Sequence, residues 1–137
     1  MRSEIFVVLL LAGCQASFAI KEVEEEPRYN PATVINVMAT VTDIREVPRG
    51  NPLTGIHLAV KVESEALEIY LGPADFVKQF EITFARGNEI QVIGSKIKFG
   101  AAHIVLAREV RKEEITLYCR DKKGEPNWKI DGGLTAR

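Results

Sequence analysis

The sequence has few residues suited to catalysis or metal binding, and it lacks the common catalytic motifs. It contains no Gly-x-Ser-x-Gly, no His-Glu-x-x-His and no phosphate-binding loop. Its soft metal ligands, apart from Cys14, are His57, His103 and Cys119, and no two of them have the spacing of a helical or knuckle-type metal site. We therefore expect a non-enzymatic protein with no cofactor. His57 and His103 are only weak candidate metal ligands, at positions we expect on the solvated sides of strands.

Long apolar runs are also scarce, and nothing after residue 19 approaches the roughly 20 apolar residues that span a bilayer. The first 19 residues are typical of a signal peptide. A positive charge at Arg2 precedes an apolar run over residues 5–11, small residues follow it, and the run is too short for a spanning helix. We therefore expect export across a membrane. A buried N-terminal strand of a cytoplasmic protein is the alternative.

Two cleavage sites compete in this leader. Residues 11–14, Leu-Ala-Gly-Cys, resemble the lipobox of bacterial lipoproteins, in which the thiol of Cys14 would carry a diacylglycerol. Cleavage after Ala19 would instead release a soluble protein that begins at Ile20. We favour lipidation of Cys14, which places the protein on the periplasmic side of the envelope. In a double-membraned bacterium, Gln15 after the cysteine favours the outer membrane.

The two cysteines therefore have different expected roles. If Cys14 is lipidated or removed, Cys119 stands alone and no intramolecular disulfide can form. Cys119 continues the apolar alternation of Ile115 and Leu117. This pattern predicts a buried structural thiol, with a reactive thiol or a metal ligand as the alternative.

The remainder of the chain is typical of a linker followed by one β domain. Residues 20–33 are acidic and contain two prolines, which favours a linker, although an ordered lead-in to a strand is the alternative. From residue 34 onward, apolar and polar residues alternate with the period of half-buried strands. Segments with this pattern cover residues 34–42, 56–62, 67–71, 90–97, 104–108 and 114–120. Residues 47–55 predict a loop and residues 74–80 the one short helix.

The order of these segments predicts an all-β fold, a small OB-like Greek-key barrel of five to six strands. The helix falls between the third and fourth strands, which favours the OB-like barrel over a generic sandwich or an SH3-like barrel. This domain would occupy residues 34–128, and residues 129–137 would form a flexible tail. Gly94 lies inside a predicted strand and indicates a bulge or a sharp bend.

Four short segments carry a family resemblance. They read LGPxxF at 71–76, GNEIxVxGS at 87–95, VLAREV at 105–110 and RDxxGxPxW at 120–128. Together they resemble a group of exported bacterial OB-like domains that includes the MamS/MamX-type domains of magnetosome-associated proteins and many uncharacterised secreted proteins. The group is more remotely similar to the periplasmic bacterial OB-fold proteins. The resemblance covers about residues 34–128 and implies the barrel fold. Some relatives carry a Cys-x-x-Cys-His haem signature, which this sequence lacks, so the resemblance implies no redox role.

Charge is distributed unevenly along the chain. Residues 20–94 hold 7 Lys and Arg against 12 Asp and Glu, whereas residues 95–137 hold 10 against 6. This asymmetry indicates either a basic patch for an anionic partner or two halves whose charges cancel in the fold.

Arg108 is a candidate binding residue. It lies in the phase that we expect to point inward, and a buried arginine needs a paired partner, here Glu109 or Asp121. A strand-end arginine whose charged group reaches solvent is the alternative. The RDxxGxPxW segment either lines a shared pocket or closes the barrel, with Trp128 as its plug. The candidate binding surface comprises Tyr70, Arg108, Arg120 and Trp128.

These features favour a binding module that recognises another component of the cell envelope, most simply an envelope protein. The first alternative is an accessory domain of an envelope metal or redox system. The second is single-stranded nucleic-acid binding, which on an OB fold uses the outer face of the second and third strands. That face is acidic and would repel phosphates. Its expected outward residues are His57, Ala59, Lys61, Glu63, Glu68 and Tyr70.

Overall fold

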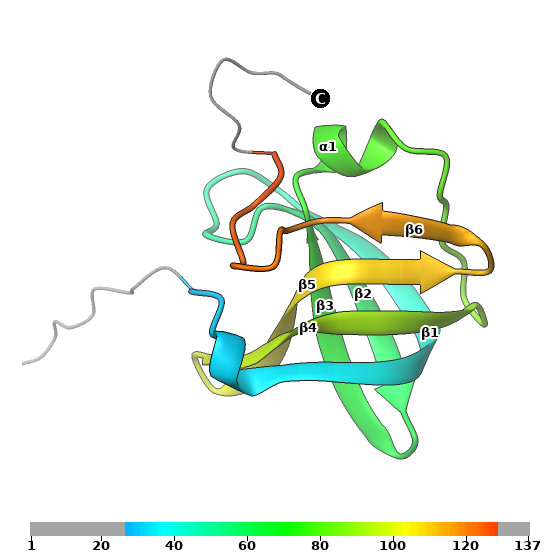
Figure 1. Cartoon of the computed structure of the whole chain (residues 1–137), viewed down its shortest axis with the longest axis horizontal. Coiled ribbons are helices and arrows are strands. Elements are labelled where there is room, and N and C mark those ends of the chain that lie inside the picture. Colours follow the sequence, from blue (N-terminus) through cyan, green and yellow to red (C-terminus); the bar gives the residue numbers. More distant parts are fainter. Residues whose placement is uncertain (1–26, 129–137) are drawn as a thin grey trace, which may run out of the picture.

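Six strands and one short helix make up the computed structural model, which describes residues 27–128 (Figure 1). The elements are β1 (Val34–Val47), β2 (Gly55–Val62), β3 (Glu65–Gly72), α1 (Ala74–Lys78), β4 (Glu89–Phe99), β5 (Ala102–Lys112) and β6 (Ile115–Tyr118). A 3-10 helix, Pro31–Thr33, precedes β1. The predicted signal peptide, its Cys14, the first part of the predicted linker and the predicted tail lie outside the described residues.

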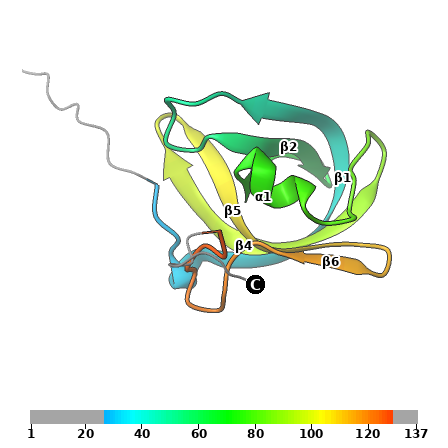
Figure 2. The same ribbon diagram turned by 90° about the horizontal axis from the view of Figure 1, so that it is seen from above.

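The strands close into a barrel. Strand β1 pairs antiparallel with both β2 and β4, β2 pairs with β3, and β4 pairs with β5. A parallel pairing of β3 with β5 closes the ring of five strands, and β6 extends the sheet beyond β5. Figure 2 shows α1 over one end of this ring. The predicted all-β barrel of five to six strands, with one short helix between its third and fourth strands, is therefore confirmed.

The barrel interior is filled by alternate residues of each strand, as the period of two requires. The most deeply buried include Leu58, Ile69 and Val92, and α1 adds Phe76 and Val77 at the covered end. A second cluster lies on the other face of β3 and β5. It comprises Leu53, Tyr70, Ile104 and Leu106. The loop between β1 and β2, residues 48–54, supplies Leu53 and thereby covers part of the outer surface of the barrel.

A bulge in β5 changes which residues point inward. Ile93 pairs with Glu109 and Gly94 pairs with Ala107, so Arg108 is the extra residue between two partners. Ala107 therefore faces the core before the bulge and Val110 faces it after. The predicted inward phase of Arg108 is wrong for this reason, whereas the bend predicted at Gly94 is confirmed. A Cβ atom at Gly94 would overlap the backbone of β5.

The chain approaches β1 through a short ordered lead-in, residues 27–33. Tyr29 packs against the second cluster, and the backbone N–H of Asn30 donates to Ser95 Oγ at 2.9 Å. The Asn30 side chain accepts from the N–H of Ala32 and caps the 3-10 helix. This end of the predicted linker is therefore held against the barrel. None of the helices within residues 27–128 has the length and apolar character that crossing a membrane requires.

Candidate functional site

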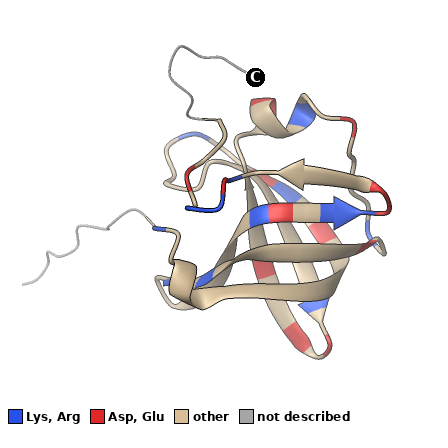
Figure 3. Cartoon of the chain, in the orientation of Figure 1, with Lys and Arg blue, Asp and Glu red and all other residues tan. Residues whose placement is uncertain are grey.

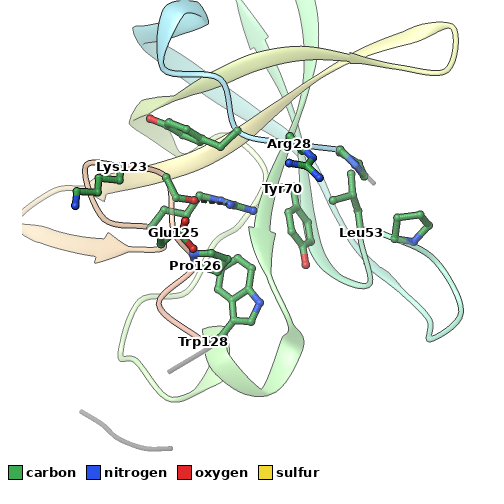
Figure 4. Close-up of a pocket in the computed structure, with 12 residues that line it drawn as sticks. Arg28, Leu53, Tyr70, Lys123, Glu125, Pro126 and Trp128 are labelled. Atoms are coloured by element: carbon green, nitrogen blue, oxygen red, sulfur yellow. Dashed lines mark hydrogen bonds between the residues drawn. The ribbon is translucent and has the colours of Figure 1, made fainter. Parts of the chain in front are cut away.

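A pocket of about 470 Å³ lies beside the end of the barrel that α1 covers (Figure 4). We call it the side pocket. Three segments that are distant in sequence surround it: the lead-in, the β1–β2 loop and the C-terminal segment, residues 119–128. Strand β3 contributes Tyr70. The lining residues are Pro27, Arg28, Tyr29, Pro52, Leu53, Tyr70, Arg120, Lys123, Gly124, Glu125, Pro126 and Trp128.

A compact turn positions the C-terminal segment. The carbonyl of Arg108, at the bulge, accepts from the backbone N–H groups of Cys119 and Arg120 at 2.8 and 3.2 Å. The carboxylate of Asp121 accepts from the N–H groups of Lys123 and Glu125, each at 2.9 Å. Gly124 has a φ of +92°, a conformation that glycine adopts without steric cost. The RDxxG part of the segment is therefore a turn that presents Arg120 to the pocket.

Arg120 is held between two aromatic rings. Its guanidinium carbon lies 5.2 Å from the centre of the Trp128 ring and 5.9 Å from that of Tyr29, within the range of cation–π attraction. Nη1 donates to the carbonyl of Gly124 at 2.8 Å. Burial lowers the pKa of Arg120 because the charged form loses hydration, but an arginine keeps its charge in proteins. No carboxylate within residues 27–128 forms an ion pair with this charge.

Trp128 packs against the barrel and also lines the pocket. Its ring centre lies 5.3 Å from that of Phe76 on α1 and 6.1 Å from that of Tyr70, which it meets edge-on. The Tyr70 hydroxyl donates to the carbonyl of Thr54 at 2.8 Å and ties β3 to the β1–β2 loop. Burial raises the pKa of Tyr70 to about 12 because the phenolate form would lose hydration. Trp128 therefore packs on α1 and β3 and at the same time lines the pocket.

His57 is buried, with only 4% of its surface exposed. Its Nε2 lies 2.7 Å from the carbonyl oxygen of Leu53, and its Nδ1 contacts the carboxylate of Glu68, which also pairs with Arg45 at 3.1 Å. The predicted solvated position is wrong for His57 and for Tyr70 opposite it, because the β1–β2 loop covers both. His103 is exposed on β5. Among the residues that the structure describes, no group of three or more metal-binding side chains is assembled.

The structure brings together three of the four residues of the predicted binding surface. Tyr70, Arg120 and Trp128 all line the side pocket. Arg108 does not, because the bulge turns it toward Glu109, whose carboxylate lies 3.5 Å from its Nε. Asp121, the other expected partner, forms the turn instead. Sequence reasoning missed Tyr29, whose only signal was an aromatic residue between the prolines of the predicted linker.

Cys119 is fully buried in the barrel core and carries a free thiol. Burial raises its pKa from 9.0 to about 12 because the thiolate would lose hydration. At about pH 8 the thiol of Cys119 therefore stays protonated, because the raised pKa keeps the thiolate form unfavourable. The predicted burial of the Cys119 thiol is therefore confirmed.

This protonation predicts slow chemistry at Cys119. In a Cys14→Ser variant, which leaves Cys119 as the one thiol, we expect an aromatic disulfide reagent to react at least about 1,000-fold more slowly with the native chain than with the urea-unfolded chain. The absorbance of the released thiolate measures both rates at about pH 8. Fast labelling of the native chain would show that the thiol is accessible and would contradict its burial.

The comparison with protein families concerns the barrel. The model of the MamS/MamX magnetosome protein family matches residues 33–117, which span β1 to β5 and most of β6. The match ends before the C-terminal segment, so the part of the side pocket that Arg120 and Trp128 form lies outside it. No curated protein matches the chain. Because the family match covers more than half of the sequence, this chain belongs to the MamS/MamX magnetosome protein family.

Proposed function

We propose that this protein is an exported, non-enzymatic binding module that recognises another protein of the cell envelope through the side pocket. The environment of Arg120 supports this proposal most. Its charge is partly buried beside two aromatic rings in an open pocket, and no described residue forms an ion pair with it. Aromatic and arginine side chains gathered at one concave place are the residues that contribute most to protein–protein binding.

The leader supports the cellular location in this proposal. Residues 1–19 have the order of a signal peptide, and Leu-Ala-Gly-Cys at 11–14 resembles a lipobox. We propose that Cys14 carries the lipid and holds the module on the periplasmic side of the envelope. Radiolabelled palmitate should enter the wild-type chain and not the Cys14→Ser variant. Absence of label from the wild type, with Ile20 as the first residue, would show a soluble exported form instead.

The described contacts give less support to the two alternatives. A metal or redox role would draw on His57, but both of its ring nitrogens already face oxygen atoms of the protein. A nucleic-acid role would draw on Tyr70 as a stacking platform, but only 4% of that residue is exposed. Neither observation points to a site for these partners.

Photo-crosslinking in cells tests the binding role. A benzoyl-phenylalanine placed at Lys123, an exposed residue on the rim of the side pocket, should give a discrete crosslinked product after irradiation. The matched control is Lys61, an exposed lysine next to the β2–β3 turn. This turn lies at the opposite end of β2 and β3 from the pocket. Equal product at both positions, or none at Lys123, would contradict binding through the pocket.

A further inference from the structure

The side pocket carries an excess of positive charge. Arg28, Arg120 and Lys123 line it, and Glu125 is the one carboxylate among its lining residues. None of these four residues forms an ion pair with another described residue. Figure 3 shows basic residues on the lead-in, the β1–β2 loop and the C-terminal segment, the three segments that meet at the pocket. The pocket therefore has an electrostatic preference for an anionic group.

Two buried polar atoms at this pocket lack hydrogen-bond partners within residues 27–128. They are the hydroxyl of Tyr29 and Nε of Arg120. Arg120 has five N–H donors in all, and the bond to Gly124 uses one of them. Buried polar groups in native proteins are nearly always paired, so unpaired groups that share one pocket call for an explanation. A ligand whose hydrogen-bond acceptor enters beside Arg120 would explain these unpaired groups.

The shape and lining of the pocket narrow the chemistry of that acceptor. A guanidinium matches a carboxylate in geometry and binds it with two parallel hydrogen bonds. The rings of Tyr29 and Trp128 flank the guanidinium and offer apolar surface to the methylene groups that carry a side-chain carboxylate. The volume of about 470 Å³ accommodates a few side chains.

We propose that the side pocket binds an acidic peptide segment of the partner protein, with an Asp or Glu carboxylate on Arg120 and neighbouring carboxylates near Arg28 and Lys123. This inference rests on the proposed function, because it names the chemistry by which the module recognises its partner.

The fluorescence of Trp128 provides the test, because it is the one tryptophan of the chain. A short oligoglutamate peptide with blocked ends, added to the full chain, should change this fluorescence in a saturable way. The matching oligoglutamine peptide should leave it unchanged. Inorganic phosphate should act only at higher concentration than oligoglutamate. Equal effects of oligoglutamine would overturn the proposal, and phosphate acting at lower concentration would assign the pocket to a phosphate group instead.

Variants identify the residues responsible. Arg120→Met should weaken oligoglutamate binding by at least about tenfold, because it removes the charge that pairs with the carboxylate. Arg111→Met is the matched control, an exposed arginine on β5 that does not line the pocket, and it should leave the affinity unchanged. If Arg120→Met fails to fold, the double variant Arg28→Gln/Lys123→Gln should still weaken binding by about fivefold. Unchanged affinity in the folded pocket variants would overturn the proposal.

The acidic residues Glu22, Glu24, Glu25 and Glu26 precede the pocket-lining Pro27 in the sequence and are a second source of carboxylates. Changing these four glutamates to glutamine should alter the affinity for oligoglutamate by less than about threefold. A larger gain in affinity would assign the pocket to the chain's own segment and overturn binding of a partner's segment. A crosslinked product at Lys123 without oligoglutamate binding would overturn this inference alone, whereas absence of that product would overturn the proposed function.

Discussion

Replacing Gly55 by alanine should destabilise the barrel by about 3 to 5 kcal/mol, the largest effect that we expect from a single substitution. Gly55 begins β2 with a φ of +134°, which L side chains rarely adopt. A Cβ atom there would overlap the carbonyl oxygen of Gly72 and come within 2.8 Å of Cα of Pro73. Both obstacles are backbone atoms at the end of β3, so no side-chain rotation relieves the overlap. Urea unfolding followed by circular dichroism measures the loss.

Gly87→Ala is the matched control for this substitution. Gly87 has a φ of +90°, but a Cβ atom there would meet nothing within 4 Å. The variant should therefore lose only the conformational part, about 1 to 2 kcal/mol. Equal losses at Gly55 and Gly87 would show that the close approach of β2 to the end of β3 contributes nothing, and would contradict this part of the fold.

Replacing His57 by phenylalanine should destabilise the chain by about 2 to 3 kcal/mol, although a ring of similar size remains against Tyr70. The substitution removes the donor that faces the carbonyl of Leu53 and the contact with Glu68. A buried acceptor without a donor costs more than the lost bond alone. Because Leu53 belongs to the β1–β2 loop, amide hydrogen exchange in residues 48–54 should also become faster.

His103→Phe is the corresponding control, since His103 is exposed on β5. It should change the free energy of unfolding by less than about 0.5 kcal/mol and leave exchange in the β1–β2 loop unchanged. If His57→Phe behaved like His103→Phe, the hydrogen bonds of His57 would not hold the loop, and the wall of the side pocket would need another explanation.

The strands were predictable from sequence because alternation of apolar and polar residues records which side of a strand faces the core. The prediction of β1 stopped at residue 42, whereas the strand continues to Val47 by pairing with Gly55. Its last residues are largely exposed, so their burial pattern carries no signal. The phase of Arg108 was also wrong, since one extra residue in a bulge reverses the alternation and leaves no mark in composition.

The side pocket was predictable only in part. Arg120 and Trp128 stood out because one short segment combines a charge, turn residues and the single tryptophan. The positions of Tyr29 and Leu53 depend on a lead-in and a loop that fold back over the outer face of β3. No local pattern encodes such a contact, because it depends on the whole barrel. The same loop explains why His57 and Tyr70, on the face expected to meet solvent, are buried.

An NMR titration of the isotope-labelled chain with the oligoglutamate peptide tests the central claim most directly. If acidic groups bind in the side pocket, the largest chemical-shift changes should occur at the indole N–H of Trp128, at Nε–H of Arg120 and in the turn 121–125. Signals of the β2–β3 turn should stay in place. Largest changes at that turn, or uniform small changes over the whole barrel, would contradict recognition through the side pocket.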